Sequence, residues 1–106
     1  MVTPDDKMTV PIDRLVFWAA RCVRRVAALA VMPRERFETP EVQAFARRED
    51  EFVRAYRTVL LLRAAEVVRF CGRVGLRGCT VDMVRDNPFL IVMAIDRHLQ
   101  GDFDEH

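Results

Sequence analysis

The stretch RTVLLLRAAEVVRF, residues 57–70, decides the fold of this chain. Its apolar residues recur at helical spacing and nearly encircle the helix, which is typical of a helix covered on more than one side. Between the start signal TPE, residues 39–41, and Gly72 there is no proline or glycine after Pro40. We therefore expect one long helix over residues 40–72, with Thr39 as its N-cap and Pro40 at its first position.

Proline and glycine also mark the other helices. Pro11 begins a first helix over residues 11–32 that Pro33 ends. Thr80 caps a short helix over residues 81–86, and NP at 87–88 begins a last helix over residues 88–100. That last helix is apolar all round for two turns, so we expect it at the centre. No strand pattern is present, and the sequence predicts an all-α, antiparallel bundle of three main helices plus a short fourth.

The length of 106 residues allows one domain. We expect a flexible N-terminal arm over residues 1–10, a single helical domain over 11–101 and an acidic tail over 102–106. The start of the chain lacks the basic and then apolar pattern of a secretory leader. Arginines interrupt the first helix too often for a membrane span. These features favour an intracellular, cytoplasmic protein.

The composition excludes several kinds of catalysis. The chain has no serine, and Lys7 is its only lysine, which removes a serine nucleophile and a phosphate-binding loop lysine. His98 and His106 are the only histidines, and the three cysteines lack the spacing of metal ligands. We expect no enzyme, no cofactor and no metal. The thiols are interpreted as core residues, although Cys71 and Cys79 bracket a glycine-rich turn where they could approach each other.

Two charges interrupt the apolar face of the long helix. Glu49 and Arg63 are fourteen residues apart, roughly 21 Å along one axis, so they cannot meet within one helix. Arg63 has Glu66 three residues on, whereas Glu49 has only apolar residues at its helical neighbour positions. Two antiparallel copies crossing near Tyr56 would pair each Glu49 with the Arg63 of the other copy, although an arginine of the first helix is an alternative. The predicted interface consists of Glu49, Phe52, Tyr56, Val59 and Arg63.

Arginine supplies nearly all of the basic charge, and it gathers in two places. The candidate anion-binding clusters are Arg21, Arg24 and Arg25 in the first helix, and Arg69, Arg73 and Arg77 around the glycine turn. Alternatively, the second cluster caps helix carbonyls and pairs with acidic residues. The net charge of +1 gives no overall attraction to nucleic acid.

Two stretches are similar to known families. A long central helix followed by a loop with arginine and threonine, GLRGCTVDMV at 75–84, resembles the histone fold over residues 40–95. That resemblance implies a dimer and DNA binding, although the central helix here is longer. The stretch AYRTVLLLRAA, residues 55–65, is similar to the Leu-Tyr-Arg motif of small mitochondrial three-helix assembly factors, with Ala55 in place of the leucine.

Three amphipathic helices with wide apolar arcs present more apolar surface than a monomer of this size covers easily. We therefore expect a non-catalytic protein–protein interaction module, either a homo-oligomer or a small subunit of a larger assembly. The alternative is a nucleic-acid-associated, histone-fold-like module that uses the arginine clusters.

Overall fold

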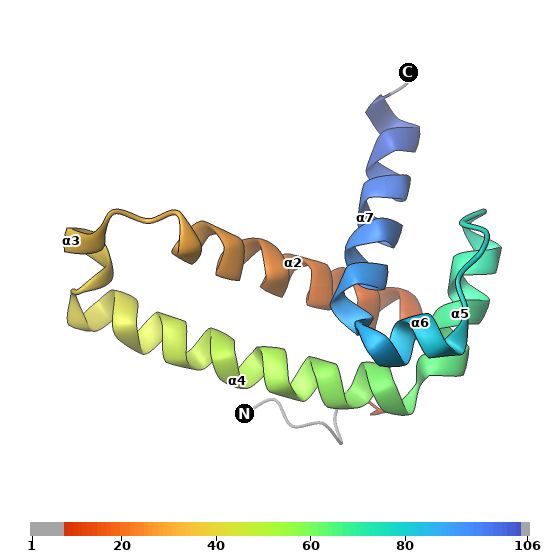
Figure 1. Ribbon diagram of the computed structural model, residues 1–106, viewed down its shortest axis with the longest axis horizontal. Helices are drawn as coiled ribbons and strands as arrows, with labels where there is room; N and C mark the ends of the chain where they lie inside the picture. The colour runs from red at the N-terminus through yellow and green to blue at the C-terminus, as the bar shows by residue number, and fades with distance from the viewer. Residues whose placement is uncertain (1–7, 105–106) are drawn as a thin grey trace.

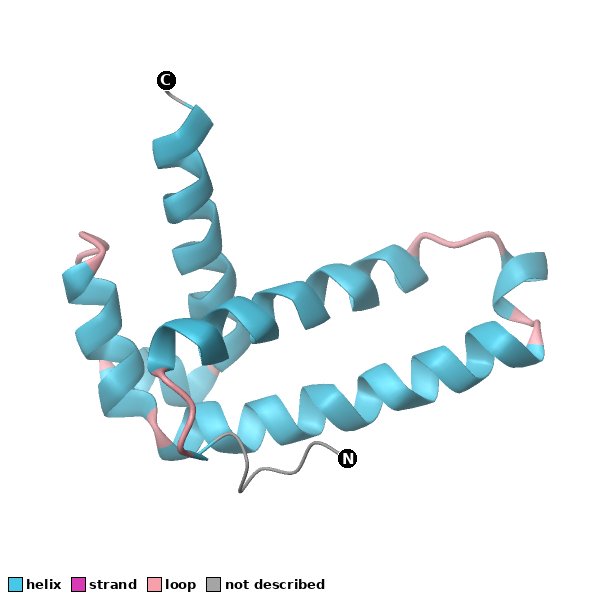
Figure 2. Ribbon diagram, turned by 180° about the vertical axis from the view of Figure 1, so that it is seen from behind, coloured by secondary structure: helices cyan, strands magenta, loops and turns pink. Residues whose placement is uncertain are grey.

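The computed structural model describes residues 8–104, and the side chains of residues 8–100. Within this range every regular element is a helix (Figure 2). The helices are α2 (Ile12–Ala30), α3 (Arg34–Phe37), α4 (Pro40–Leu62), α5 (Ala64–Arg73), α6 (Val81–Asp86) and α7 (Pro88–Asp104). The predicted all-α class is confirmed, and α3 is an addition to it. The predicted arm and acidic tail lie partly outside the described residues.

Most predicted helix ends match the structure because the capping residues act as expected. Thr39 accepts a hydrogen bond from the Val42 amide at 3.4 Å, and Thr80 accepts one from the Met83 amide at 3.2 Å. Pro33 precedes α3 and Pro88 opens α7, so both prolines lie at helix boundaries. The predicted end of the last helix is wrong: α7 passes through Gly101, which a helix tolerates at a cost of about 1 kcal/mol.

The predicted single helix over residues 40–72 is wrong, because the chain turns at Arg63. Arg63 has φ −107° and ψ 27°, which ends α4, and α5 leaves in a new direction (Figure 1). A straight helix of that length would measure roughly 50 Å, more than the 43 Å of the molecule's longest extent. The turn instead brings α5 back against α2, where Val67 and Phe70 are buried.

Helices α2 and α4 form an antiparallel hairpin, and the core lies at only one end of it (Figure 1). The buried residues of α2 run from Ile12 to Cys22, and those of α4 run from Glu49 to Leu60. Helices α5, α6 and α7 gather at this same end of the hairpin. The innermost side chains are Leu15, Val59, Leu60, Val67, Val84, Val92 and Ile95.

The predicted central position of the last helix is also wrong. Helix α2 takes that place, since it packs against α4, α5 and α7. Helix α7 crosses the hairpin and runs away from it, rather than alongside as in a regular bundle (Figures 1 and 2). Ile91, Val92 and Ile95 face the core, while Leu90 is 64% exposed. Phe89, Met93 and Leu99 are only partly buried.

Candidate functional site

A buried ion pair joins the two helices of the hairpin. Glu49 of α4 is 3% exposed, and its Oε1 accepts a hydrogen bond from Arg25 Nε of α2 at 2.6 Å. Cys22, one turn earlier on α2, donates its thiol proton to Glu49 Oε2 at 3.2 Å. Burial, and then the contact with Glu49, raise the pKa of the Cys22 thiol to about 12. The cation for Glu49 therefore comes from the first helix of the same chain.

This pair corrects the predicted crossing of two copies. Glu49, Tyr56, Val59 and Arg63 are all buried within the single chain, and Phe52 packs partly buried against the same core. The side chains that we assigned to an interface thus fill the contact of α4 with its own neighbours. The sequence signal was an apolar helix face, and such a face does not distinguish a partner helix of the same chain from one of another chain.

The Arg63 side chain has hydrogen-bond partners at the turn between α4 and α5. Its Nε and Nη2 donate to the two carboxylate oxygens of Glu66 at 2.5 and 3.1 Å, and Nη1 donates to the Val10 carbonyl at 2.6 Å. The guanidinium holds the pKa of Glu66 below its ordinary value. The residue therefore ties α4, α5 and the segment before α2 together, with Glu66 as the partner that the sequence suggested.

The first arginine cluster is divided among separate partners. Arg24 forms an ion pair with Asp96 of α7, and Arg25 pairs with Glu49. Arg21 lies over the Phe17 ring, 5.6 Å from its centroid. The structure therefore does not gather these three guanidinium groups into one free cationic site, and two of them hold neighbouring helices to α2.

The second cluster is only partly assembled. Arg69 and Arg73 share one face of α5 and line a shallow hollow with Ile12 and Glu66. Arg73 also lies over the Phe70 ring, 5.4 Å from its centroid. Arg77 is exposed in the loop after α5 and does not line this hollow. Glu66 offsets part of the positive charge there, which weakens an anion site.

The far end of the hairpin carries an apolar cleft with a volume of about 250 Å³. We call it the hairpin cleft; its lining consists of Arg25, Ala28, Leu29, Met32, Glu41, Val42 and Phe45. The lining residues are either partly buried or exposed, and none is fully buried. Helices α5, α6 and α7 lie at the other end of the hairpin (Figures 1 and 2). Val26 and Val31 nearby are 37% and 83% exposed. The cleft is therefore an apolar surface that the described part of the chain leaves open.

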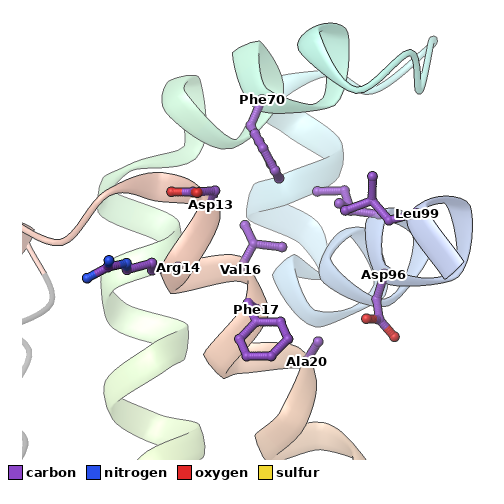
Figure 3. Close-up of a pocket in the computed structure, with 9 residues that line it drawn as sticks. Asp13, Arg14, Val16, Phe17, Ala20, Phe70, Asp96 and Leu99 are labelled. Atoms are coloured by element: carbon purple, nitrogen blue, oxygen red, sulfur yellow. The ribbon is translucent and has the colours of Figure 1, made fainter.

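A second apolar groove of about 280 Å³ lies where α5 and α7 both meet α2 (Figure 3). Phe70 points from α5 toward Val16 and Leu99 approaches from α7, while Phe17 and Ala20 continue the groove along α2. Asp13, Arg14 and Asp96 stand at its rim. This groove is bordered by three helices, so it is more enclosed by the fold than the hairpin cleft.

The buried cysteines and His98 make structural contacts. Cys22 and Cys71 are buried, and the Cys22 thiol donates a hydrogen bond to Glu49. Burial is the main cause that raises the pKa of Cys71 to about 12. His98 Nε2 lies 2.8 Å from the Val74 carbonyl oxygen, which ties α7 to the end of α5. Across the described residues, no three metal-binding side chains gather as a ligand group.

Comparison of the chain with protein-family models, with curated proteins and with solved structures finds no match. Among the described helices, none is both long and apolar enough to cross a membrane. The candidate site consequently rests on geometry: an open, apolar hairpin end beside a buried ion pair.

Proposed function

We propose that the chain is a non-catalytic protein-interaction module that pairs with a second copy of itself through the hairpin cleft. The observation that carries the proposal is the uneven burial of the hairpin. Apolar side chains also occur on α2 after Cys22 and on α4 before Glu49. No residue of these two segments is fully buried. An apolar face of this kind normally finds cover in a partner.

The charges of the hairpin cleft favour a copy of the same chain. Arg25 lies at the inner end of the cleft, level with Glu49, and Glu41 lies about 12 Å away at the outer end, eight residues earlier on α4. A two-fold axis through the middle of the cleft would bring the Arg25 of each copy level with the Glu41 of the other. Such an isologous contact is self-complementary in the sign of its charges.

A matched pair of substitutions tests the cleft. Ala28 and Ala44 are both exposed alanines within helices, but only Ala28 lines the cleft. We expect Ala28→Arg to place a charge in the apolar contact and to weaken the dimer at least tenfold, measured by sedimentation equilibrium. Ala44→Arg should leave the dimer constant within about twofold. Equal effects of the two substitutions would overturn the assignment of this surface.

The nucleic-acid alternative makes a different prediction. Its support is the exposed pair Arg69 and Arg73 on one face of α5. Duplex binding would weaken steeply with salt and fall on replacement of both exposed arginines by glutamine. The dimer through the cleft would instead persist at high salt, because its contact is mainly apolar.

A further inference from the structure

The end of α5 sends the chain back beside its own last turn. The Leu76 amide donates to the Cys71 carbonyl at 2.8 Å, and the Gly75 amide donates to the Gly72 carbonyl at 3.2 Å. Gly75 has φ +85°, the left-handed conformation that this helix ending requires. The two bonds fix Leu76 next to Cys71, only three residues before Cys79.

A second reversal returns the chain to the core near Cys71. Gly78 has φ +89°, and Thr80 then caps α6, so Cys79 is held between a turn and a helix start. Cys79 packs, half-buried, against the core cluster that contains Cys71, at the point where α6 begins to pack against α5. The neighbouring Cys79 thiol also contributes to the raised pKa of Cys71. Both are free thiols, as is Cys22, whose thiol contacts Glu49 of α4.

We propose that Cys71 and Cys79 form an oxidisable thiol pair that closes an intramolecular disulfide on exposure to a hydroperoxide, and that Cys22 takes no part. The Cys79 thiolate attacks the peroxide, so that an S–O bond forms, the O–O bond breaks and hydroxide leaves. The Cys71 sulfur then displaces the hydroxyl group of this sulfenic acid: the S–S bond forms, the S–O bond breaks, and the Cys71 proton leaves in water. Two thiols lose two electrons, which reduce one hydroperoxide.

The order of the two steps follows from exposure. Cys79 is half-buried at the surface and Cys71 is 1% exposed, so only Cys79 is open to an oxidant from solvent. Burial raises the pKa of Cys71 and keeps its thiol protonated. This suits the second step, in which Cys71 reacts with the nearby sulfenic acid of Cys79. The bond would fasten the last turn of α5 to the start of α6. This site is independent of the proposed dimer.

Peptide mapping tests the pair directly. The wild-type protein is treated with hydrogen peroxide, its free thiols are alkylated, and it is digested with trypsin without reduction. Arg69, Arg73, Arg77 and Arg85 place the two cysteines in separate fragments, 70–73 and 78–85. We expect these fragments to be joined, with the loss of two hydrogen atoms from the intact mass and a fall from three free thiols to one. The oxidised protein should still run as a single chain on a non-reducing denaturing gel.

Two variants complete the test. Cys22→Ser should still join the fragments, whereas Cys79→Ser should keep both of its remaining thiols free after the same treatment. Circular dichroism before oxidation checks that each variant is folded. A disulfide that involves Cys22, sulfinic acid on Cys79 without a crosslink, or three unchanged thiols would each overturn the proposal.

Discussion

Arg25 and Glu49, 24 residues apart in the sequence, form an ion pair that marks where the filled half of the α2–α4 hairpin ends. Toward α7 the hairpin is packed on several sides, and away from it the apolar residues lie open. The Glu49 carboxylate is nearly inaccessible, whereas the Arg25 side chain is 38% exposed. The pair therefore combines a buried anion with a cation that reaches solvent at the edge of the cleft.

Replacing Arg25 by methionine should destabilise the chain by about 2–4 kcal/mol, because it leaves a buried carboxylate without its cation. The double variant Arg25→Met with Glu49→Leu should regain most of that loss, since both charges are then absent. Urea melts of the two variants and the wild type measure the difference. If the free energy of unfolding of Arg25→Met lies within about 0.5 kcal/mol of the wild-type value, Glu49 does not depend on Arg25 for its stabilisation.

Arg63 should not be replaceable by lysine. Its guanidinium bonds both carboxylate oxygens of Glu66 and the Val10 carbonyl, a geometry that a point charge cannot reproduce. We expect Arg63→Lys to cost about 1–2 kcal/mol and Arg63→Ala about 2–4 kcal/mol, measured by denaturant unfolding. Arg57→Lys on the exposed side of α4 is the matched control and should change stability by under about 0.5 kcal/mol. Equal, negligible effects at both positions would contradict the role of Arg63.

Stability should fall in alkaline solution because of the buried thiols. The pKa of Cys22 is about 12 in the folded chain, against an ordinary value of 9.0 for an exposed thiol. Since the pKa of Cys22 is higher in the folded chain, the contribution of this thiol to the free energy of unfolding is complete below pH 9 and is lost as the pH rises from 9 toward 12. The free energy of unfolding falls by at most about 1.4 kcal/mol per pH unit for each such thiol.

Cys22→Ala should therefore lose stability less steeply than the wild type between about pH 8 and pH 10. The comparison uses the slope, because the substitution also shifts the absolute stability at every pH. Urea melts across this range provide the measurement. Parallel curves for the two proteins would show that the Cys22 thiol does not titrate differently in the folded and unfolded chains.

Helix α7 offers a test of the one-sided core. Ile95 is fully buried and Leu90 is 64% exposed, although both lie in the same apolar stretch. We expect Ile95→Ala to cost about 2–5 kcal/mol and Leu90→Ala less than about 0.5 kcal/mol. Thermal or urea unfolding distinguishes them. Similar losses at both positions would mean that α7 is covered on both sides.

The helix boundaries were predictable because they depend on local chemistry. Thr39, Thr80, Asn87 and the prolines act through a few neighbouring backbone groups, which a sequence shows directly. The turn at Arg63 was not predictable in this way. It depends on where α2 begins and on the position of the Val10 carbonyl, which is 53 residues away in the sequence.

The candidate site, too, was predictable from the sequence only in part. The sequence revealed that Glu49 needs a cation and that Arg63 can use Glu66. It did not reveal whether that cation comes from α2 or from another copy, since both offer arginine beside an apolar stripe. The open end of the hairpin was also hidden, because burial of Val26 or Phe45 depends on where α7 crosses.

The central claim is that two copies pair through the hairpin cleft, and the mass of the wild-type protein in solution tests it most directly. Multi-angle light scattering over a dilution series from about 100 µM down to about 1 µM covers the range in which a standard interface associates. We expect a particle of twice the chain mass of 12.3 kDa at the upper end. For Ala28→Arg, but not Ala44→Arg, the mass should fall to that of one chain. A wild-type particle with the mass of a single chain throughout the series would contradict the account.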